Sequence, residues 1–262
     1  MQEIIRMILE SIYEPTFSKT SHGFRQGKSC HTALLQIQGT FTGVKWFIEG
    51  DIKGYFDNID HHILIDILRE RIKDEAFIEI IWKFMRAGYM EKWNYNSTYS
   101  GVAQGSGFSP ILANLYLDKL DKYIEEYKLK FDTGKIRGKT KEYGMIKGRY
   151  QRLNEKCRDN WTKMSKEEKE IALKQLKELK DYSLSIPSAD PMDSSYKRIQ
   201  YTRYCDDFLI GVIGSKDDAI KIKQDIKEFL NNKLKLELSD EKTLITSGKD
   251  KAKFLSYEIT IT

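Results

Sequence analysis

Two adjacent carboxylates, Asp206 and Asp207, lie between two apolar, strand-like stretches of the chain. The stretch before them covers Ile199–Arg203, and the stretch after them covers Phe208–Val212. This pattern predicts a β-hairpin whose tip, Tyr204–Asp207, carries acid. Carboxylates that a turn forces together repel each other, unless a divalent cation lies between them and a phosphate. One interpretation is therefore a metal-dependent phosphoryl-transfer site. The other is a solvated turn, because Asp is a common turn residue.

Net charge alone does not identify a polyanionic partner, since the 262 residues include 44 Lys+Arg and 39 Asp+Glu, a formal charge of +5. The basic residues are concentrated, because residues 121–180 contain 18 Lys+Arg and 11 Asp+Glu. Aromatic residues are interleaved with them, which is typical of a surface where phosphates meet cations and bases stack on rings. A solvated helical excursion explains the same composition equally well. With 40% hydrophobic residues, the chain is expected to be globular.

The cysteines give no sign of a disulfide framework or a zinc site, since Cys30, Cys157 and Cys205 are far apart and form no CxxC pair. This usage fits a reducing compartment. No apolar run approaches membrane-spanning length, and the first residues lack the layout of a signal peptide. We therefore expect a soluble, cytoplasmic protein with no membrane partner.

Apolar residues recur at helical spacing in the first part of the chain. The pattern predicts helices over Ile4–Ile12, where Pro15 ends it, and over Ile63–Ile72 and Phe77–Met85, with a short helix through Leu34.

A loop at Gln104–Pro110 leads into the next predicted helix, with Ser109 as its N-cap and Pro110 as its first residue. A charged insertion follows at about residues 128–197. Within it, Ser165 and Glu168 have the spacing of a capping box, which predicts a helix to about Lys180.

The elements around the acidic hairpin form a βαββαβ split arrangement. A strand at Val44–Gly50 leads directly to Asp51, and after the hairpin we expect a helix from Ser215, a strand at Leu234–Leu238 and a strand pair around Phe254–Thr260. Such a sheet brings Asp51 beside the hairpin tip. Two divalent ions about 3.5–4 Å apart need carboxylates from more than one strand, and three aspartates in this layout meet that need.

Five ordered blocks resemble those of reverse transcriptases, and of the group II intron reverse transcriptase/maturase family in particular. The blocks are Gly23–Ser29 (GFRQGKS), Asp51–Ile59 (DIKGYFDNI), Gln104–Pro110, Tyr204–Asp207 (YCDD) and Glu241–Thr243 (EKT). Each block is weak alone, but their order and spacing are specific and extend over nearly the whole chain.

The resemblance implies an α+β fold with the fingers and palm of a right-hand polymerase. The palm would be the βαββαβ antiparallel sheet with helices on one face. The expected domains are fingers at 1–39 and 59–108, with an N-terminal part missing, and a palm at 40–58 and 109–262 that contains the charged insertion. The thumb or maturase domain is expected to be absent.

The resemblance also implies roles for individual residues. Asp51, Asp206 and Asp207 would hold two Mg²⁺ ions, for which Mn²⁺ is a candidate substitute, with the carbonyl of Ile52 as a further ligand. One ion would lower the pKa of the primer 3′-hydroxyl, and the other would steady the triphosphate. Phe56, five residues after Asp51, corresponds to the steric gate that selects deoxynucleotides. Ordinary core packing is the alternative for this ring.

Further residues of the blocks are expected at the substrates. Gln104 and Gly105 would lie along the incoming nucleotide and the template base, although a plain turn also explains the glycine. Lys242 corresponds to a cation proposed to neutralise, and to protonate, the pyrophosphate leaving group. Arg25 and Lys28 are candidates for contacts with template or intron RNA. For these three cations, solvation at the surface is the alternative.

The implied function is RNA-directed DNA synthesis within a group II intron-encoded protein of the bacterial cytosol. Such a protein binds its intron RNA, assists splicing and copies that RNA into DNA. The implied partners are intron RNA, an RNA template with a DNA primer, and dNTPs. A second copy of the chain, in a homodimer, is a further candidate partner. Without a thumb, this chain is expected to be weakly active or inactive by itself.

Three departures from the family pattern leave the carboxylates untouched: Gln26 replaces a proline, Ser106-Gly107-Phe108 replace a glycine-isoleucine-isoleucine run, and Cys205 replaces an alanine. Alternative functions are an RNA-binding maturase module in which polymerisation is secondary or lost, a retron or phage-defence reverse transcriptase, and a nucleotide cyclase on a similar split sheet.

Overall fold

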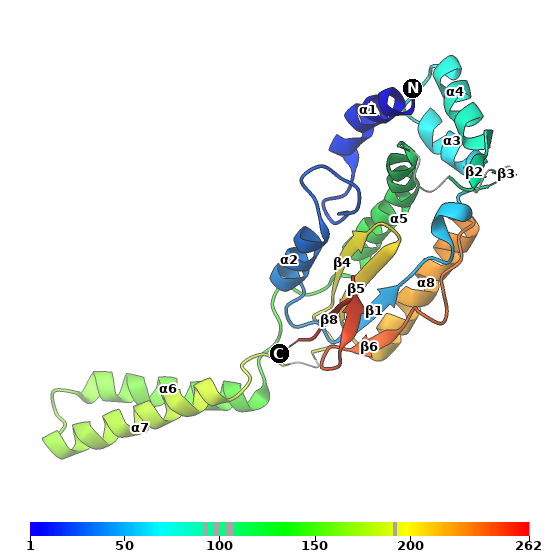
Figure 1. The fold of residues 1–262 in the computed structure, drawn as a ribbon. Helices are drawn as coiled ribbons and strands as arrows, with labels where there is room; N and C mark the ends of the chain where they lie inside the picture. The colour runs from blue at the N-terminus through cyan, green and yellow to red at the C-terminus, as the bar shows by residue number, and fades with distance from the viewer. Residues whose placement is uncertain (92–93, 97–99, 103–106, 191–192, 262) are drawn as a thin grey trace. The chain divides into compact units, whose positions relative to one another are not determined.

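The computed structural model describes residues 1–261 apart from 92–93, 97–99, 103–106 and 191–192 (Figure 1). It divides into two compact units, one formed by Met1–Asp132 with Lys197–Thr262 and the other by Thr133–Tyr196. All predicted site residues that the structure describes belong to the first unit.

A four-stranded antiparallel sheet forms the centre of the first unit (Figure 1). Its strands are β1 (Trp46–Gly50), β4 (Arg198–Tyr204), β5 (Asp207–Ile213) and β6 (Ile245–Ser247), in the spatial order β4-β5-β1-β6. The predicted acidic hairpin is β4–β5. Helix α5 (Ser109–Phe131) precedes β4, and α8 (Lys216–Leu234) connects β5 to β6. The chain therefore has the predicted βαββαβ order.

The last strand of this order differs from the prediction, which placed it at Leu234–Leu238. Leu234 instead ends α8, where Lys235 adopts a left-handed conformation with φ of 50°. Leu236 and Leu238 are buried, but the only pairing here is an isolated bridge between Leu238 and Ile52. The apolar alternation thus reflects burial in the core, and the fourth strand is β6.

The two faces of the sheet carry different elements. Ile48, Tyr201 and Ile210 share one face by their register, and they belong to the large core cluster that includes α5 and α8. On the other face, Phe47 stacks on Phe41 with ring centroids 6.3 Å apart. This face is covered by α2 (Cys30–Thr40) and by the hairpin β7–β8 (Ala252–Phe254 and Tyr257–Ile259). The helices of the split motif lie on one face, as expected.

The remaining helices follow the predicted periodicity, except that the helix predicted to reach Ile72 ends at Arg69. They are α1 (Gln2–Tyr13), which a short 3-10 turn at Glu14–Thr16 follows, α3 (His61–Arg69) and α4 (Glu75–Arg86). Another 3-10 turn covers Tyr55–Asp57, and β2 (Tyr89–Glu91) pairs with β3 (Asn94–Asn96).

Helix α5 begins one residue earlier than predicted, because its N-cap is Phe108 and not Ser109. Phe108 is buried against Phe84, with ring centroids 5.8 Å apart, so core packing fixes the start of the helix. Pro110 is then the second helical residue, where its missing N–H has no intrahelical acceptor to lose.

The second unit is a helical hairpin of α6 (Lys141–Asn160) and α7 (Lys166–Ser185) (Figure 1). The predicted capping box between Ser165 and Glu168 is present, and α7 continues past Lys180 to Ser185. Its two helices bury only Cys157 and Ala172, which fits a charged, solvated excursion. Across the described chain, no helix combines the length and apolar character that crossing a membrane requires.

Candidate active site

Asp51 and Asp207 lie at the ends of two paired strands. Asp51 directly follows β1, and Asp207 is the first residue of β5. The register pairs Gly50 with Phe208, so continuing it by one residue sets Asp51 opposite Asp207. Gly50 is required here, because a Cβ on it would lie 2.1 Å from the Phe208 ring. Both carboxylates line one recess, together with Lys242 and the tip of the β7–β8 hairpin.

The turn between β4 and β5 presents Asp206 beside Asp207. Tyr204 pairs with Asp207, so Cys205 and Asp206 form a two-residue turn. Cys205 has φ of 57°, a left-handed conformation that suits tight hairpins and costs a non-glycine residue about 1–2 kcal/mol. The segment at Gly23 packs directly on this turn, since a Cβ on Gly23 would lie 2.4 Å from the Cys205 nitrogen.

The carboxylates of the hairpin are poorly solvated and repel their neighbours. Burial, and to a smaller degree the charge of Asp51, raises the pKa of Asp206 above its ordinary value. Burial, followed by the charges of Asp206 and Asp51, raises the pKa of Asp207 to about 6. This excess of negative charge is what a divalent cation would neutralise.

Lys242 supplies part of that neutralisation. Its Nζ lies 3.1 Å from Oδ1 of Asp51, and its side chain is 70% exposed. The hydrogen bond to Asp51, and then the charge of Asp51, raise the pKa of Lys242. The lysine is therefore protonated at neutral pH. Sequence reasoning placed Lys242 at the active site but did not foresee this ion pair.

The oxygen atoms at this site suit Mg²⁺, which binds carboxylate and carbonyl oxygens. Within the described ranges, no three His, Cys, Asp or Glu side chains already surround a point where an ion could bind. Asp51 is instead paired with Lys242, so binding an ion would require this carboxylate to exchange its partner. The site therefore has the ligand types for Mg²⁺, in an arrangement that an ion would have to complete.

Ile52 and Phe56 lie in a second recess that shares Asp51 with the first and also includes Asp206 and Lys242. Ile52 pairs with Leu238, but the hydrogen bonds of this bridge are made by the flanking residues. Lys53 N donates to Glu237 O, and Ser239 N donates to Asp51 O. The carbonyl of Ile52 therefore points away from the partner segment. Its predicted role as a metal ligand is compatible with this geometry.

The other predicted substrate residues are placed less directly. Gln104 and Gly105 lie outside the described residues. Arg25 is engaged within the protein: its guanidinium donates to Glu14 and to the carbonyls of Ser18 and Ser21, and only 8% of its side chain is exposed. Lys28 is half-buried, and its Nζ forms an exposed hydrogen bond with the Lys19 carbonyl at 3.3 Å. Of these two cations, Lys28 has the less engaged charged group.

Sequence reasoning missed the ion pair between Arg203 and Asp121, which lies behind the acidic turn. Arg203 donates through Nε and Nη2 to the carboxylate of Asp121 on α5, at 2.8 and 2.6 Å. Its other hydrogen bonds reach the carbonyl of Cys205 at 2.8 Å, the hydroxyl of Ser21 at 2.8 Å and Oδ1 of Asn114 at 3.3 Å. Burial opposes the charged form of Arg203, but the Asp121 carboxylate outweighs it and raises the pKa of the guanidinium. Strand alternation was the available signal, because Arg203 shares the inward face with Tyr201.

Glu49 is a second residue that sequence reasoning missed, and it connects three strands. This buried carboxylate on β1 accepts a hydrogen bond from the hydroxyl of Thr246 on β6 and another, at 2.9 Å, from the backbone nitrogen of Lys253 on β7. Glu49 thereby holds the β7–β8 hairpin against the strand that leads to Asp51.

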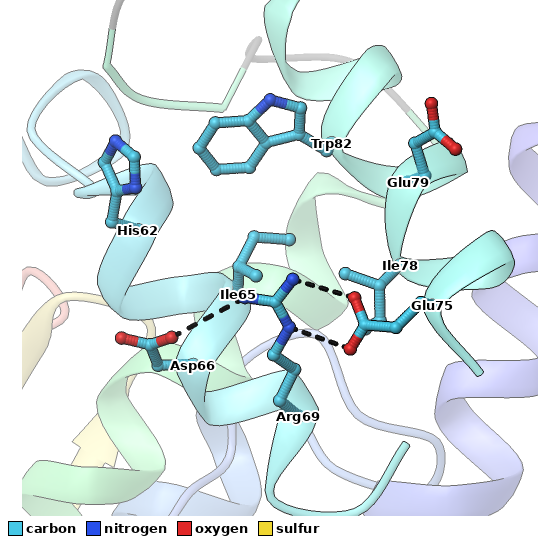
Figure 2. A pocket seen from close by; sticks show the side chains of 8 residues that line it. All are labelled: His62, Ile65, Asp66, Arg69, Glu75, Ile78, Glu79 and Trp82. Atoms are coloured by element: carbon cyan, nitrogen blue, oxygen red, sulfur yellow. Dashed lines mark hydrogen bonds and ion pairs between the residues drawn. The ribbon is translucent and has the colours of Figure 1, made fainter. Parts of the chain in front are cut away.

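A separate recess lies between α3 and α4, with Trp82 facing His62 across it (Figure 2). Arg69 lies within this recess and forms ion pairs with Glu75, at 2.8 Å, and with Asp66, at 4.0 Å. None of the predicted site residues lines this recess, and the cation there is already neutralised. The carboxylates of the sheet therefore remain the candidate active site.

Known proteins match the chain over nearly all of its length. The model of the family described as "Reverse transcriptase (RNA-dependent DNA polymerase)" matches residues 1–142 and 171–259. "Group II intron-encoded protein LtrA" of Lactococcus lactis subsp. cremoris is 46% identical over 261 residues, which are 100% of this chain and 42% of that protein. "Putative COX1/OXI3 intron 2 protein" of Saccharomyces cerevisiae is 39% identical, over 100% of this chain and 29% of that protein. The chain thus spans less than half of these relatives.

Solved structures show a similar fold at low sequence identity. The structure of apo telomerase from Candida tropicalis matches with a TM-score of 0.56 and 13% identity, over 99% of this chain and 39% of that one. At this identity, the likeness concerns the fold alone.

Proposed function

Because the chain belongs to the reverse transcriptase family, we propose that it is the RNA-directed DNA polymerase domain of a group II intron-encoded protein. One observation carries the proposal: the sheet gathers Asp51, Asp206 and Asp207 around recesses that also hold Lys242. In this assignment the split sheet with α5 and α8 is the palm, and the fingers are residues 1–39 and 59–108.

The three aspartates would hold Mg²⁺, together with the carbonyl of Ile52. Bound there, Mg²⁺ supplies charge neutralisation for the triphosphate and a lowered pKa for the primer 3′-hydroxyl. Asp51 lines two recesses, one beside the β7–β8 hairpin and one that contains Phe56. Its carboxylate is therefore placed to serve both the primer 3′-hydroxyl and the triphosphate. We assign the first recess to the primer end and the second to the incoming nucleotide.

Two further residues act on the nucleotide. Phe56 narrows its recess, and a ring at this place would clash with a 2′-hydroxyl and select dNTPs. With Asp51 engaged in holding an ion, Lys242 would be released from its ion pair, and its protonated amine would be free to meet the pyrophosphate leaving group. It can then donate a proton to the departing oxygen.

The wider function follows from the relatives. Group II intron RNA is the expected template and ligand, and the exposed cations of the helical hairpin α6–α7, such as Arg149, Arg152 and Lys174, are candidate phosphate contacts. Splicing assistance and intron mobility would be activities of the whole protein.

The test, made with the full-length protein, is Mg²⁺-dependent extension of a DNA primer on an RNA template, with intron RNA binding measured in parallel. The variant that carries both Asp206→Asn and Asp207→Asn should lose extension and keep RNA binding, since metal ligation and phosphate contacts use different residues. Asp217→Asn, an exposed carboxylate on α8, is the matched control and should extend normally. Extension by the double variant at the wild-type rate would refute the assignment.

A second function, an RNA-binding maturase module without polymerase activity, is the other outcome of the same experiment. It would be indicated if neither the wild type nor the double variant extends a primer, while both bind intron RNA tightly and with a steep salt dependence.

A further inference from the structure

Phe24 combines two unusual features, exposure and backbone strain. Its side chain is 52% exposed, although it is a large aromatic residue, and its backbone has φ of 54°. A non-glycine residue in this left-handed region costs about 1–2 kcal/mol, and such strain persists where the surroundings impose it.

The residues on each side of Phe24 impose its conformation. The carbonyl of Gly23 accepts a hydrogen bond of 2.8 Å from the side chain of Asn114, and Gly23 packs against the backbone of Cys205. On the other side, the Arg25 guanidinium is held by Glu14 and by the carbonyls of Ser18 and Ser21. Phe24 is thus fixed in place between two anchored neighbours.

The ring of Phe24 meets the ring of Phe56. Their centroids lie 6.4 Å apart with an interplanar angle of 74°, an edge-to-face contact. Phe56 also contacts the ring of Tyr55, whose centroid is 5.3 Å away, and Tyr55 is buried. Phe56 is therefore held between a buried aromatic residue and an exposed one, at the edge of the recess assigned to the incoming nucleotide.

We propose that Phe24 is a positioning residue that fixes the orientation of the Phe56 ring and so determines how strictly this enzyme rejects ribonucleotides. The inference rests on the proposed polymerase function and on Phe56 as the residue that meets the sugar. Phe24 acts through Phe56, because the Phe56 ring can reject a 2′-hydroxyl only while it cannot swing away.

The test compares Phe24→Gly with Phe24→Tyr, both made in the full-length protein, in primer extension on an RNA template with dATP or ATP. Glycine accepts a positive φ without strain, so Phe24→Gly should keep or raise the melting temperature. The ratio of kcat/KM for dATP to that for ATP should fall about tenfold, because one lost pocket contact changes discrimination by about that factor. Phe24→Tyr retains the ring and should keep the wild-type ratio.

Lys235→Gly is the matched control. Lys235 also has a positive φ, of 50°, but its ion pair is with Asp60, and it lines neither recess of the site. The control releases similar backbone strain and should leave the nucleotide ratio unchanged. A ratio that changes equally in both glycine variants would show that strain release alone is responsible.

Failure of this inference is distinguishable from failure of the proposed function. Normal extension by Phe24→Gly with the wild-type nucleotide ratio would overturn the role of Phe24 and leave the polymerase assignment intact. Binding of fluorescent dATP and ATP to the complex with template and primer, in Ca²⁺, gives a second readout without turnover. Absence of both extension and nucleotide binding in the wild type would overturn both proposals.

Discussion

The guanidinium of Arg203 and the carboxylate of Asp121 form an ion pair through two hydrogen bonds, with only 1% and 0% of the two side chains exposed. Isolated charges at such depth would be strongly unfavourable, and they are tolerated because each satisfies the other. The pair joins α5 to the strand that carries the acidic turn. Arg203 also donates to the Cys205 carbonyl, so the position of Asp206 and Asp207 depends on a contact outside the site.

Breaking this pair should strongly destabilise the protein. Asp121→Asn leaves the Arg203 charge buried without a counter-ion, and we expect a loss of about 3–5 kcal/mol in the free energy of unfolding. Urea denaturation measures it. The matched control is Glu258→Gln, which breaks the exposed pair of Glu258 and Lys251 and should cost far less stability, because solvent screens exposed charges. Equal losses in the two variants would contradict the importance of burial.

Gly23→Ala should distort the acidic turn. The added Cβ would lie 2.4 Å from the backbone nitrogen of Cys205, and a backbone atom cannot move aside as a flexible side chain can. We expect destabilisation of about 1–3 kcal/mol and reduced primer extension. Gly39→Ala is the control, since Gly39 is an exposed residue of α2 with nothing within 4 Å of the new atom. Alanine there should stabilise the protein by up to about 1 kcal/mol.

Metal binding and stability should both depend on the protonation of Asp207. Its pKa is about 6 in the fold against an ordinary value of 3.8, so folding favours the protonated form. In the metal-free protein, this stabilisation is complete below about pH 4 and is lost as the pH rises through 6. The free energy of unfolding should fall by about 1–3 kcal/mol over this pH range. The upper value converts the full pKa difference into free energy, and lower values allow for solvent screening. Asp206, whose pKa is raised in the same direction, should add to it.

Urea denaturation at pH 4 and pH 7.5, without and with Mg²⁺, measures this dependence. The difference between wild type and Asp207→Asn gives the contribution of Asp207 together with its coupling to Asp206, because groups away from this pair titrate equally in both. Mg²⁺ should bind more tightly as the pH rises from 5 to 7, since the ion requires the charged carboxylate. A wild-type stability that shows no larger loss than the variant over this range would disprove the assigned pKa.

Lys242→Met should separate metal binding from chemistry. Without the ammonium group, Asp51 has no competing partner, so Mg²⁺ should bind the protein at least as tightly as in the wild type. The rate of nucleotide addition should fall about 10²-fold, because the leaving group loses its proton donor. Isothermal titration with Mg²⁺ and single-turnover extension provide the two measurements. Lys227→Met, which removes a cation paired with Asp240 instead, should change neither value.

Local patterns in the sequence were sufficient to predict most of the strands and helices that surround the candidate site. The acidic hairpin, the strand before Asp51 and the βαββαβ order follow from strand alternation and helical periodicity, and the resemblance added Lys242. What could not be predicted depends on contacts between distant segments. Leu234–Leu238 has the alternation of a strand, and only the packing of Leu236 and Leu238 into the core decides against it.

Side-chain partners were the least predictable feature. Asp51 and Lys242 are 191 positions apart, and Arg203 and Asp121 are 82 positions apart, so no local spacing relates them. An arginine on the inward face of an apolar strand indicates that a buried acid must exist, but several acids of α5 were candidates. The strain at Phe24 was equally hidden, because it arises from how its neighbours are anchored.

The connection between α5 and β4 has a consequence for how this protein can change. The backbone nitrogen of Ile199 donates to Oδ1 of Asp132 at 2.8 Å, so the two ends of the segment that forms the second unit are joined within the first. The entropic cost of closing a connection grows only with the logarithm of its length, by about 0.6 kcal/mol for each doubling. Residues 133–196 can therefore lengthen, shorten or exchange their surface charges at little cost to the sheet, so this segment can vary without altering the residues of the candidate active site.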